Sequence, residues 1–415
     1  MKAFGKSERE IWVGIGLSVG ITLTMMAVYG LGGFHWLELH TYDMRMSLRG
    51  TQSVKSPILL VLNDEQTLTH LGIAPSRVTR THYAHAIQHL RHAKARLIVL
   101  DVIFADRGDP DENHLLANAM AQAGNVVLAR YIGPEQTMVP LPVFQHAAIG
   151  EGLINIMPDS DGVLRSMPLL GVGYQQDQLR TFFTLGAEAG RLYLDPDGVL
   201  PLNVDTPGLA RLGEIGIPIE HNTTLINFTG PSGTFSSLPF WQIVKGEFPP
   251  DQVNGKIVLI GSSAATMQDF HLTPLAQKET TTLKAQSATI SGTRMPGVEV
   301  HANLLNMFLT QQFITHSSPS LVYLVMGTVG LLCGLLVTLI PKGELGVILG
   351  VIGLLGSLIG LSIFLFIHHN YWLDTVPLIA IINGHFALAT AYQRYLVVRQ
   401  KNHLRAMLSE REKEG

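Results

Sequence analysis

The chain has 415 residues, of which 47% are hydrophobic and only 15% are charged, and its mean hydropathy is +0.25. Soluble globular proteins carry about 25% charged residues, so this deficit excludes a disordered chain and argues against a wholly soluble one. The formal net charge of −3 argues against nucleic-acid binding, and the single cysteine, Cys333, excludes an intrachain disulfide framework and a cysteine-based zinc site.

Four long apolar segments predict helices that cross a membrane, because each has few or no charged residues and is close to the roughly 20 residues that a crossing requires. The segments are 11–33, 319–340, 346–367 and 376–397. The first follows a basic tail, as a signal peptide does. However, its apolar part is longer than that of a signal peptide, and the residues from Leu31 to Phe34 contain no small-residue cleavage site. We therefore interpret it as an uncleaved anchor.

Lysine and arginine in the short connecting segments predict the orientation of these helices. They occur in the tail 1–10, at Lys342 and in the tail that begins at Arg394, but not in 368–375. Such residues favour the cytoplasmic side. The pattern predicts four crossings, cytoplasmic tails at 1–10 and 398–415, and a large domain, 34–318, on the opposite side of the membrane.

The segment 34–318 alternates short β-branched runs with amphipathic patterns, which is typical of a mostly parallel α/β sheet. Tyr131–Pro218 is richer in glycine and proline and predicts irregular antiparallel additions. The predicted strands are Pro57–Asn63, Arg96–Phe104, Asn125–Arg130, Thr223–Phe228 and Lys256–Gly261. The predicted helices are Thr81–Ala95, Asp111–Gly124 and Pro296–Phe313.

Asp101 and Asp106 flank the end of a predicted strand, where parallel sheets place functional groups. They are candidate ligand-binding residues, although aspartate also caps turns and helices. A second candidate pocket comprises Asn155, Asp159, Asp161 and Arg165. The sequence Pro158–Gly162 also fits an ordinary turn, and it lacks the closing glutamate of a calcium loop.

Two groups of side chains have the chemistry of metal ligands. The first group is Asp269, His271, Glu299 and His301; the alternative interpretation is a set of hydrogen bonds that fix turns, with Glu299 favoured by a helix dipole. The second is a stripe on one helix face, made of His82, His85, His89 and His92. Such a stripe can bind a transition metal or respond to pH, or it can be a solvated polar face.

The apolar segments contain small and polar residues that indicate helix packing. Glycines recur in 319–340 and 346–367, which favours close packing within a bundle or a dimer. Asn383 and His385 interrupt the fourth segment. Polar groups are costly in lipid, so these two predict either interhelical hydrogen bonds or a transport path.

The order of these elements, an anchor, an outer α/β domain of roughly 285 residues and further membrane helices, resembles bacterial receptors with a type-2 CHASE domain. The matching segments are Tyr42–Arg45 with Leu48–Gly50, Asp101–Asp106, Gly152–Asn155 followed by Asp159–Arg165 and Pro168, Ile226–Pro231, Gly255–Gly261, Asp269–Pro274 and Pro296–Asn303. The resemblance extends from Phe34 to about Gln393. It implies a periplasmic sensor domain at 34–318, a location in the inner membrane, and Asn227 as an additional candidate ligand residue.

The expected fold is therefore an α/β periplasmic sensor domain joined to a bundle of four transmembrane helices. The expected function is detection of an unknown periplasmic ligand and relay to a cytoplasmic signalling partner, in a homodimer embedded in the bilayer and without nucleic acid. Members of this family commonly continue into a cyclase or kinase, and no such catalytic motif follows Gln393 here, so we expect no enzyme activity. Alternatives are the sensor portion of an adenylate cyclase or protein kinase, and a transport component. The sequence identifies neither a cofactor nor the stimulus.

Overall fold

The structure is a computed structural model, and it describes residues 8–133, 135–175, 178–197, 202–206, 208–276, 294–339 and 344–414. The chain divides into two compact units. The helical unit consists of Met1–Arg45 and Thr315–Gly415, and the α/β unit is Met46–Ile314. The α/β unit is thus inserted between Arg45 and Thr315 of the helical unit.

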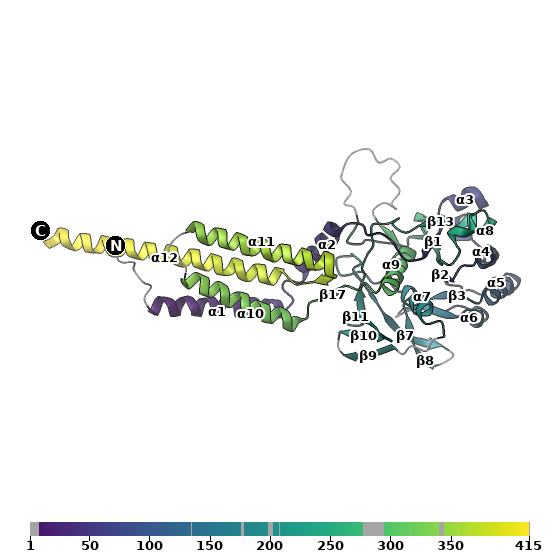
Figure 1. Ribbon diagram of the computed structural model, residues 1–415, viewed down its shortest axis with the longest axis horizontal. Helices are drawn as coiled ribbons and strands as arrows, with labels where there is room; N and C mark the ends of the chain where they lie inside the picture. The colour runs from purple at the N-terminus through teal and green to yellow at the C-terminus, as the bar shows by residue number, and fades with distance from the viewer. Residues whose placement is uncertain are drawn as a thin grey trace. The chain divides into compact units, whose positions relative to one another are not determined.

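A seven-stranded sheet forms the centre of the α/β unit (Figure 1). The strand order is β13-β1-β14-β2-β3-β4, and β5 also pairs with β3. The pairings are parallel except that of β3 with β4. The strands are β1 (Ile58–Asn63), β2 (Leu97–Leu100), β3 (Val126–Ile132), β4 (Thr137–Met138), β5 (Gly150–Leu153), β13 (Ser237–Pro239) and β14 (Ile257–Ser262).

Helices cover both faces of this sheet, because successive strand residues point to opposite faces and both sets are apolar. Leu59 and Val61 of β1 face one core, whereas Ile58 and Leu60 face the other. The first core is covered by α4 (Arg80–His92), α5 (Pro110–Ala123), α6 (Pro142–Ala147) and α8 (Phe240–Lys245). The second is covered by α7 (Leu185–Leu194) and α9 (Gly297–Thr310). The mixed α/β class with a mostly parallel sheet is therefore confirmed.

The predicted antiparallel additions are also present, in small separate sheets. A hairpin joins β7 to β8, a meander joins β9, β10 and β11, and β12 pairs with β6. Thr223–Phe228 was predicted as a strand, but it contributes only β12, outside the main sheet. The remaining elements of this unit are α3 (Gln66–Leu71), β6 (Ser166–Pro168), β7 (Leu170–Gln175), β8 (Gln178–Phe183), β9 (Leu202–Thr206), β10 (Leu209–Leu212), β11 (Ile215–Pro218), β12 (Thr223–Leu225), β15 (Phe270–His271) and β16 (Met295–Pro296).

The helical unit contains long helices that run side by side (Figure 1). Both α1 and α10 contact α12, and α11 also packs on α12. A short parallel pair, β17 with β18, joins the segment before α10 to the loop before α12. The elements are α1 (Glu8–Gly30), α2 (His35–Arg49), β17 (Thr315–His316), α10 (Pro319–Leu339), α11 (Glu344–His369), β18 (Tyr371–Trp372) and α12 (Val376–Glu414).

Within the described part of the chain, three helices rather than the four predicted are long and apolar enough to cross a membrane. They contain the segments Trp12–Gly30, Pro319–Leu336 and Ile348–His369. The predicted fourth crossing, 376–397, is the first part of α12. Asn383 and His385 make this part less apolar than the other three helices, which explains the difference. Lys2, Lys6 and Lys342, which supported the predicted orientation, lie outside the described residues.

Candidate functional site: a cavity at the carboxyl edge of the sheet

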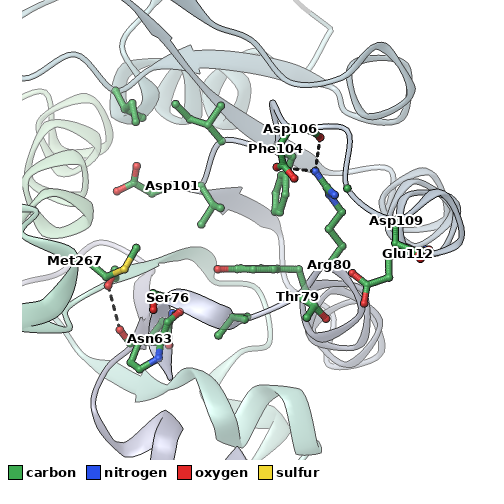
Figure 2. Close-up of a pocket in the computed structure, with 18 residues that line it drawn as sticks. Asn63, Ser76, Thr79, Arg80, Asp101, Phe104, Asp106, Asp109, Glu112 and Met267 are labelled. Atoms are coloured by element: carbon green, nitrogen blue, oxygen red, sulfur yellow. Dashed lines mark hydrogen bonds and ion pairs between the residues drawn. The ribbon is translucent and has the colours of Figure 1, made fainter. Parts of the chain in front are cut away.

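A cavity of about 590 Å³ opens where three parallel strands end. Asn63 ends β1, Asp101 follows β2, and Ser262 ends β14, and all three line the cavity. The start of α4 and the loop 102–109 complete the wall (Figure 2). Ligand sites in parallel α/β sheets lie at this edge, and cavities of this size accept small molecules. Asp101 and Asp106, the candidate ligand-binding residues, both line this cavity.

The loop after β2 is held in place by the start of α5. The Asp109 side chain accepts hydrogen bonds from the backbone nitrogens of Asp111 and Glu112, at 2.8 and 3.2 Å, and Pro110 occupies the first turn. Gly108 has a φ of 51°, and a Cβ there would collide with the guanidinium of Arg80. Glycine is thus needed at this position for the loop to pass so close to Arg80.

Arg80 is the cation of the cavity, and its side chain is only 8% exposed. Its Nη2 donates to the backbone oxygen and to Oδ1 of Asp106, at 2.6 and 2.9 Å. The guanidinium also lies 5.6 Å from the ring centroid of Phe144. Its Nε is buried and has no hydrogen-bond partner among the described residues. Asp106 therefore compensates the charge of Arg80 from the exposed rim.

Asp101 and Tyr83 make no side-chain hydrogen bond with any described residue, although both line the cavity. Burial, and secondarily the negative charge of Asp269, raise the pKa of Asp101 to about 8. Burial, and secondarily the charge of Asp101, raise the pKa of the Tyr83 hydroxyl. Both groups are therefore protonated at pH 7. A carboxyl group that lines a cavity, has a raised pKa and has no partner among the described residues is a recognised sign of a functional site.

Asp269, His271 and His301 lie near one another behind Asp101. His271 Nε2 is 3.1 Å from Asp269 Oδ1. Burial lowers the pKa of His301 to about 4, and His271 adds to this effect while Asp269 opposes it. The Nδ1 atom of His301 has no partner among the described residues. His301 is therefore a neutral buried imidazole at pH 7.

Glu299 is not part of this group, because its carboxylate faces a different loop. It accepts hydrogen bonds from the backbone nitrogens of Gly233 and Thr234 and from the Ser232 hydroxyl, at 2.9 to 3.1 Å. Among the described residues, no three His, Cys, Asp or Glu side chains are placed to hold a metal ion. The structure therefore does not assemble Asp269, His271, Glu299 and His301 into one metal site, because alternate helix positions point to different faces.

The predicted pocket around Arg165 is a structural clamp rather than an opening. Arg165 has a 1% exposed side chain and binds Asp159 at 2.7 Å and Asp161 at 2.8 Å. The Asn155 side chain bonds both backbone groups of Ile132, at 3.1 and 2.7 Å. Each of these groups is occupied by the fold, and none of the four lines the cavity.

Asn227 is similarly occupied by protein groups. Its Oδ1 accepts a hydrogen bond from Arg49 Nη1, and its Nδ2 donates to the Gln312 oxygen at 3.0 Å. Arg49 also donates to the backbone oxygen of Phe228 at 2.6 Å. Asn227 therefore ties the last turn of α2 to the end of α9, and it does not line the cavity.

The histidine stripe on α4 does not converge on one point. His82 accepts a hydrogen bond from the Thr79 backbone nitrogen in a capping box, and His89 bonds the Ile243 oxygen at 2.8 Å. His85 and His92 are exposed. Burial, and secondarily the charge of His85, lower the pKa of His82. His82 and His89 are therefore engaged in positioning α4, while the opposite stripe of Tyr83, Ile87 and Leu90 is buried as predicted.

A second buried polar cluster lies in the helical unit, at the start of α12. Glu38 accepts hydrogen bonds from the backbone nitrogens of Thr375 and Val376, at 2.8 and 2.9 Å, and so caps α12. Arg45 is 3.4 Å from Glu38 and also donates to the Thr375 hydroxyl. Burial lowers the pKa of Arg45, and Glu38 opposes this effect. We refer to Glu38, Arg45 and Thr375 as the Glu38 cluster.

Asp374 extends this cluster to two further elements. Its carboxylate accepts a hydrogen bond from the Tyr29 hydroxyl at 2.9 Å and pairs with His316 Nε2 at 2.8 Å. The ring of His316 stacks on Trp372 at 4.0 Å. Residues from α1, α2, β17 and the α12 loop therefore meet at one buried point, so a displacement of one of them must disturb the others.

Polar and small residues inside the bundle are used for packing. His385 lies 2.7 Å from the Ser18 hydroxyl and bonds the Ile381 oxygen at 2.8 Å. A Cβ on Gly330 or Gly334 of α10 would collide with Thr22 or Ser18 of α1. His385 is thus accounted for by an interhelical hydrogen bond, so it gives no support for a transport path.

Sequence reasoning found Asp101 and Asp106 but missed Arg80 and Tyr83 as cavity residues. Tyr83 was assigned only to the apolar stripe of its helix. The available signal was its hydroxyl group, because a residue that only fills an apolar core does not need one and a buried hydroxyl indicates a polar surrounding. Arg80 is at the first turn of α4, next to the capping residue Thr79, and no local pattern shows that this turn reaches the sheet edge.

The chain thus combines an α/β unit, whose parallel sheet has a cavity at its carboxyl edge, with long apolar helices. A family model, the CHASE2 domain, matches residues 20–340. The chain therefore belongs to the CHASE2 domain family, a family of sensor domains found in signalling receptors. No curated protein and no solved structure matches it.

Proposed function

We propose that this protein is a membrane-bound sensor that binds a small ligand in the cavity of its α/β unit and relays the event through its helices to a cytoplasmic partner. The observation that supports it most strongly is the pair of unpartnered groups, Asp101 and Tyr83, in an edge cavity of a sensor-family domain. A ligand can change the output only by binding two conformations unequally, and unpaired cavity groups provide such a difference in affinity.

The proposed relay runs through α2 and the Glu38 cluster. The helix α2 is continuous from His35 to Arg49, and Arg49 is bonded to Phe228 in the α/β unit. Glu38, which lies on α2 seven positions before Arg45, caps the start of α12. A change at the last turn of α2 would therefore alter the cap of a helix that continues to Glu414.

The proposed topology has the α/β unit in the periplasm and both termini in the cytoplasm. It requires the first part of α12 to cross the membrane with the three apolar helices, shielded by its hydrogen bond to Ser18. Single cysteines in a Cys333→Ser background test this. A cysteine at Asp251 should react with an impermeant maleimide on intact cells, whereas a cysteine at Arg405 should react only after lysis. Labelling of both on intact cells would contradict the topology.

A homodimer is proposed because one face of α11 has no partner in the described chain. A Cβ on Gly350, Gly353, Gly356 or Gly360 would meet no atom within 4 Å. Such faces allow close approach of a second helix. In a Cys333→Ser background, Gly356→Cys should form a disulfide dimer on oxidation in membranes, whereas the control Leu354→Cys, about 200° away on the helix, should not. Equal cross-linking of both would exclude this face.

The relay is tested with a reporter cyclase fused after Glu414. We expect Glu38→Gln to change the basal output of the fusion, because a neutral amide weakens the cap of α12 and leaves Arg45 buried without its counter-charge. The matched control is Glu247→Gln, an exposed position in the α/β unit. Output that is indifferent to Glu38→Gln and to every substitution in the cavity would contradict the proposed function.

A second candidate is the sensor portion of an adenylate cyclase or protein kinase whose catalytic domain is encoded elsewhere. The continuous helix α12, from Val376 to Glu414, supports it, because such a helix carries a movement beyond its apolar part. A reading frame immediately downstream that begins with a cyclase or kinase domain, and co-purification of its product with this chain, would favour this candidate. In both cases the chain itself is proposed to be non-catalytic.

A further inference from the structure

The charges around the cavity are unevenly compensated. Among the described residues that line it, the one cation, Arg80, is paired with Asp106, and its Nε is buried. Asp109 and Glu112 lie on one side of the cavity and Asp101 lies on the other (Figure 2). We call the side of Asp101 the inner end, because Asp101 is less exposed than Asp109. Asp109 is occupied by two backbone nitrogens, and Glu112 by the Thr81 hydroxyl at 3.1 Å. The cavity therefore has an excess of acceptors and negative charge, and its single cation is already engaged.

The inner end of the cavity lacks a hydrogen-bond donor for its carboxyl group. Asp101 accepts no hydrogen bond from any described residue, and the nearest charge acting on it is that of another carboxylate, Asp269. The Tyr83 hydroxyl interacts electrostatically with Asp101 but forms no hydrogen bond in the described structure. Asp101 is half-buried, so its carboxyl group can accept hydrogen bonds from a ligand in the cavity.

The walls between these polar ends are apolar. Val102, Ile103, Phe104, Ile154 and Met267 line them. The rings of Tyr83 and Phe104 meet edge to face, with centroids 5.3 Å apart. Such walls favour an organic body over a hydrated metal ion, and aromatic rings also attract cations. The absence of a three-ligand metal group among the described residues agrees with this.

We propose that the cavity binds a small organic cation, a protonated amine with an apolar body, whose ammonium group donates hydrogen bonds to Asp101 and Tyr83. The proposal rests on the proposed sensory function and names the ligand class of the same site. An ammonium group supplies three donors and a positive charge, which matches an inner end whose carboxyl and hydroxyl oxygens accept no hydrogen bond from a described residue. An anionic ligand would instead be repelled by Glu112 and Asp109, and above about pH 8 by Asp101 as well.

The test compares three probes of similar shape and different charge: 2-phenylethylamine, 2-phenylethanol and 3-phenylpropanoate. The full chain is placed in phosphatidylcholine nanodiscs, and each probe is titrated by calorimetry at pH 8.5 against empty nanodiscs. We expect the amine to bind at least roughly tenfold more tightly than the alcohol, since a hydrogen bond between charged groups is stronger than one between neutral groups. We expect no measurable binding of the carboxylate.

Two variants of the cavity assign the binding to the proposed groups. Asp101→Asn and Tyr83→Phe keep the shape of each side chain, and each should weaken amine binding, Asp101→Asn by roughly tenfold or more. The control Asp251→Asn, an exposed aspartate outside the cavity, should leave it unchanged. Carboxylate binding as tight as amine binding, or amine binding that survives Asp101→Asn, would overturn the proposal.

Failure of the proposed ligand class can be told apart from failure of the proposed sensory function. Amine binding without any change in reporter output would retain this ligand class and defeat the relay. A reporter that responds to Glu38→Gln, in a protein that does not bind the amine, would retain the relay and defeat the ligand class. Thermal melting of Asp101→Asn and Tyr83→Phe in the same nanodiscs shows whether each variant is folded before its affinity is read.

Discussion

In the turn before β6, Asp159 and Asp161 both bind Arg165, whereas at the sheet edge Asp101 binds no described residue. Both regions belong to the α/β unit, and in each of them several aspartates lie close together in the sequence. Their difference lies in the partners. A buried charge that the fold has fully paired serves stability, and a buried carboxyl without a partner remains available to a ligand.

The largest effect is expected from breaking the Arg165 clamp. Asp159→Asn combined with Asp161→Asn leaves a guanidinium buried, with a 1% exposed side chain and no counter-charge from the turn. We expect the free energy of unfolding to fall by about 3–5 kcal/mol. Urea titration of the full chain in nanodiscs, followed by tryptophan fluorescence, measures it. If the double variant were as stable as Asp251→Asn, the clamp would have no structural role.

A smaller loss is expected at Glu299, whose carboxylate is also fully used by the protein. Glu299→Gln replaces an acceptor of three backbone hydrogen bonds and one hydroxyl hydrogen bond by an amide. The expected loss is about 1.5–3 kcal/mol, the contribution of a hydrogen bond to a charged group. The same urea titration applies, with Glu247→Gln as the exposed control. A metal ligand at this position would instead make stability depend on added divalent ions, which we do not expect.

At Asp101, in contrast, a substitution is expected to increase the free energy of unfolding near neutral pH. Its pKa in the folded chain is about 8, against about 3.9 when unfolded, so the folded state binds more protons between these values. Stability should therefore decrease as the pH rises from 4 to 8, by up to about 1.4 kcal/mol for each pH unit. The Asp101→Asn variant lacks this pH-dependent contribution. Its free energy of unfolding should therefore exceed that of the native chain at pH 7.5 and nearly equal it at pH 4.5. Equal pH profiles for the two proteins would contradict the assignment.

The contribution of His301 to the pH dependence of stability is expected to be smaller, because the difference between its folded and unfolded pKa values is smaller and lies in the acid range. Its pKa is about 4 in the folded chain and about 6.5 when unfolded. The stability that it contributes is present above about pH 6.5 and is lost as the pH falls toward 4. His301→Gln should flatten the stability profile in this window, whereas His85→Gln, at an exposed position on α4, should not. Melting temperatures at pH 4.5, 5.5 and 6.5 compare the two.

Much of the sheet was predictable from the sequence, because its central strands are uninterrupted apolar runs. Pro57–Asn63 and Lys256–Gly261 correspond to β1 and β14, and the predicted helix 81–95 corresponds to α4. The two strands are buried on both faces, and the helix has one clear apolar stripe, so these patterns leave little ambiguity. The helix α2, His35–Arg49, was missed: Leu39, Tyr42 and Met46 form a buried stripe at helical spacing, but the acidic and basic residues between them hid it.

The site was only half predictable, because it depends on which strands and helices are neighbours in space. Asp101 follows a strand, so its position at the sheet edge could be expected. The order β1-β14-β2 brings Ser262 and Asn63 beside it, although they are 199 positions apart in sequence. Likewise, Arg165 and Asn155 looked like pocket residues, since nothing local shows that their hydrogen bonds are already satisfied within the protein.

The discontinuity of the helical unit has a consequence for biosynthesis. The helix α1 leaves the ribosome first, but the helices that pair with it, α10 and α12, follow the whole segment Met46–Ile314. During that interval the hydroxyl of Ser18 has no His385 to bond, and Thr22 has no Gly330 against which to pack. In a newly made chain, Ser18 and Thr22 of α1 must therefore remain without these partners until α10 and α12 have been translated.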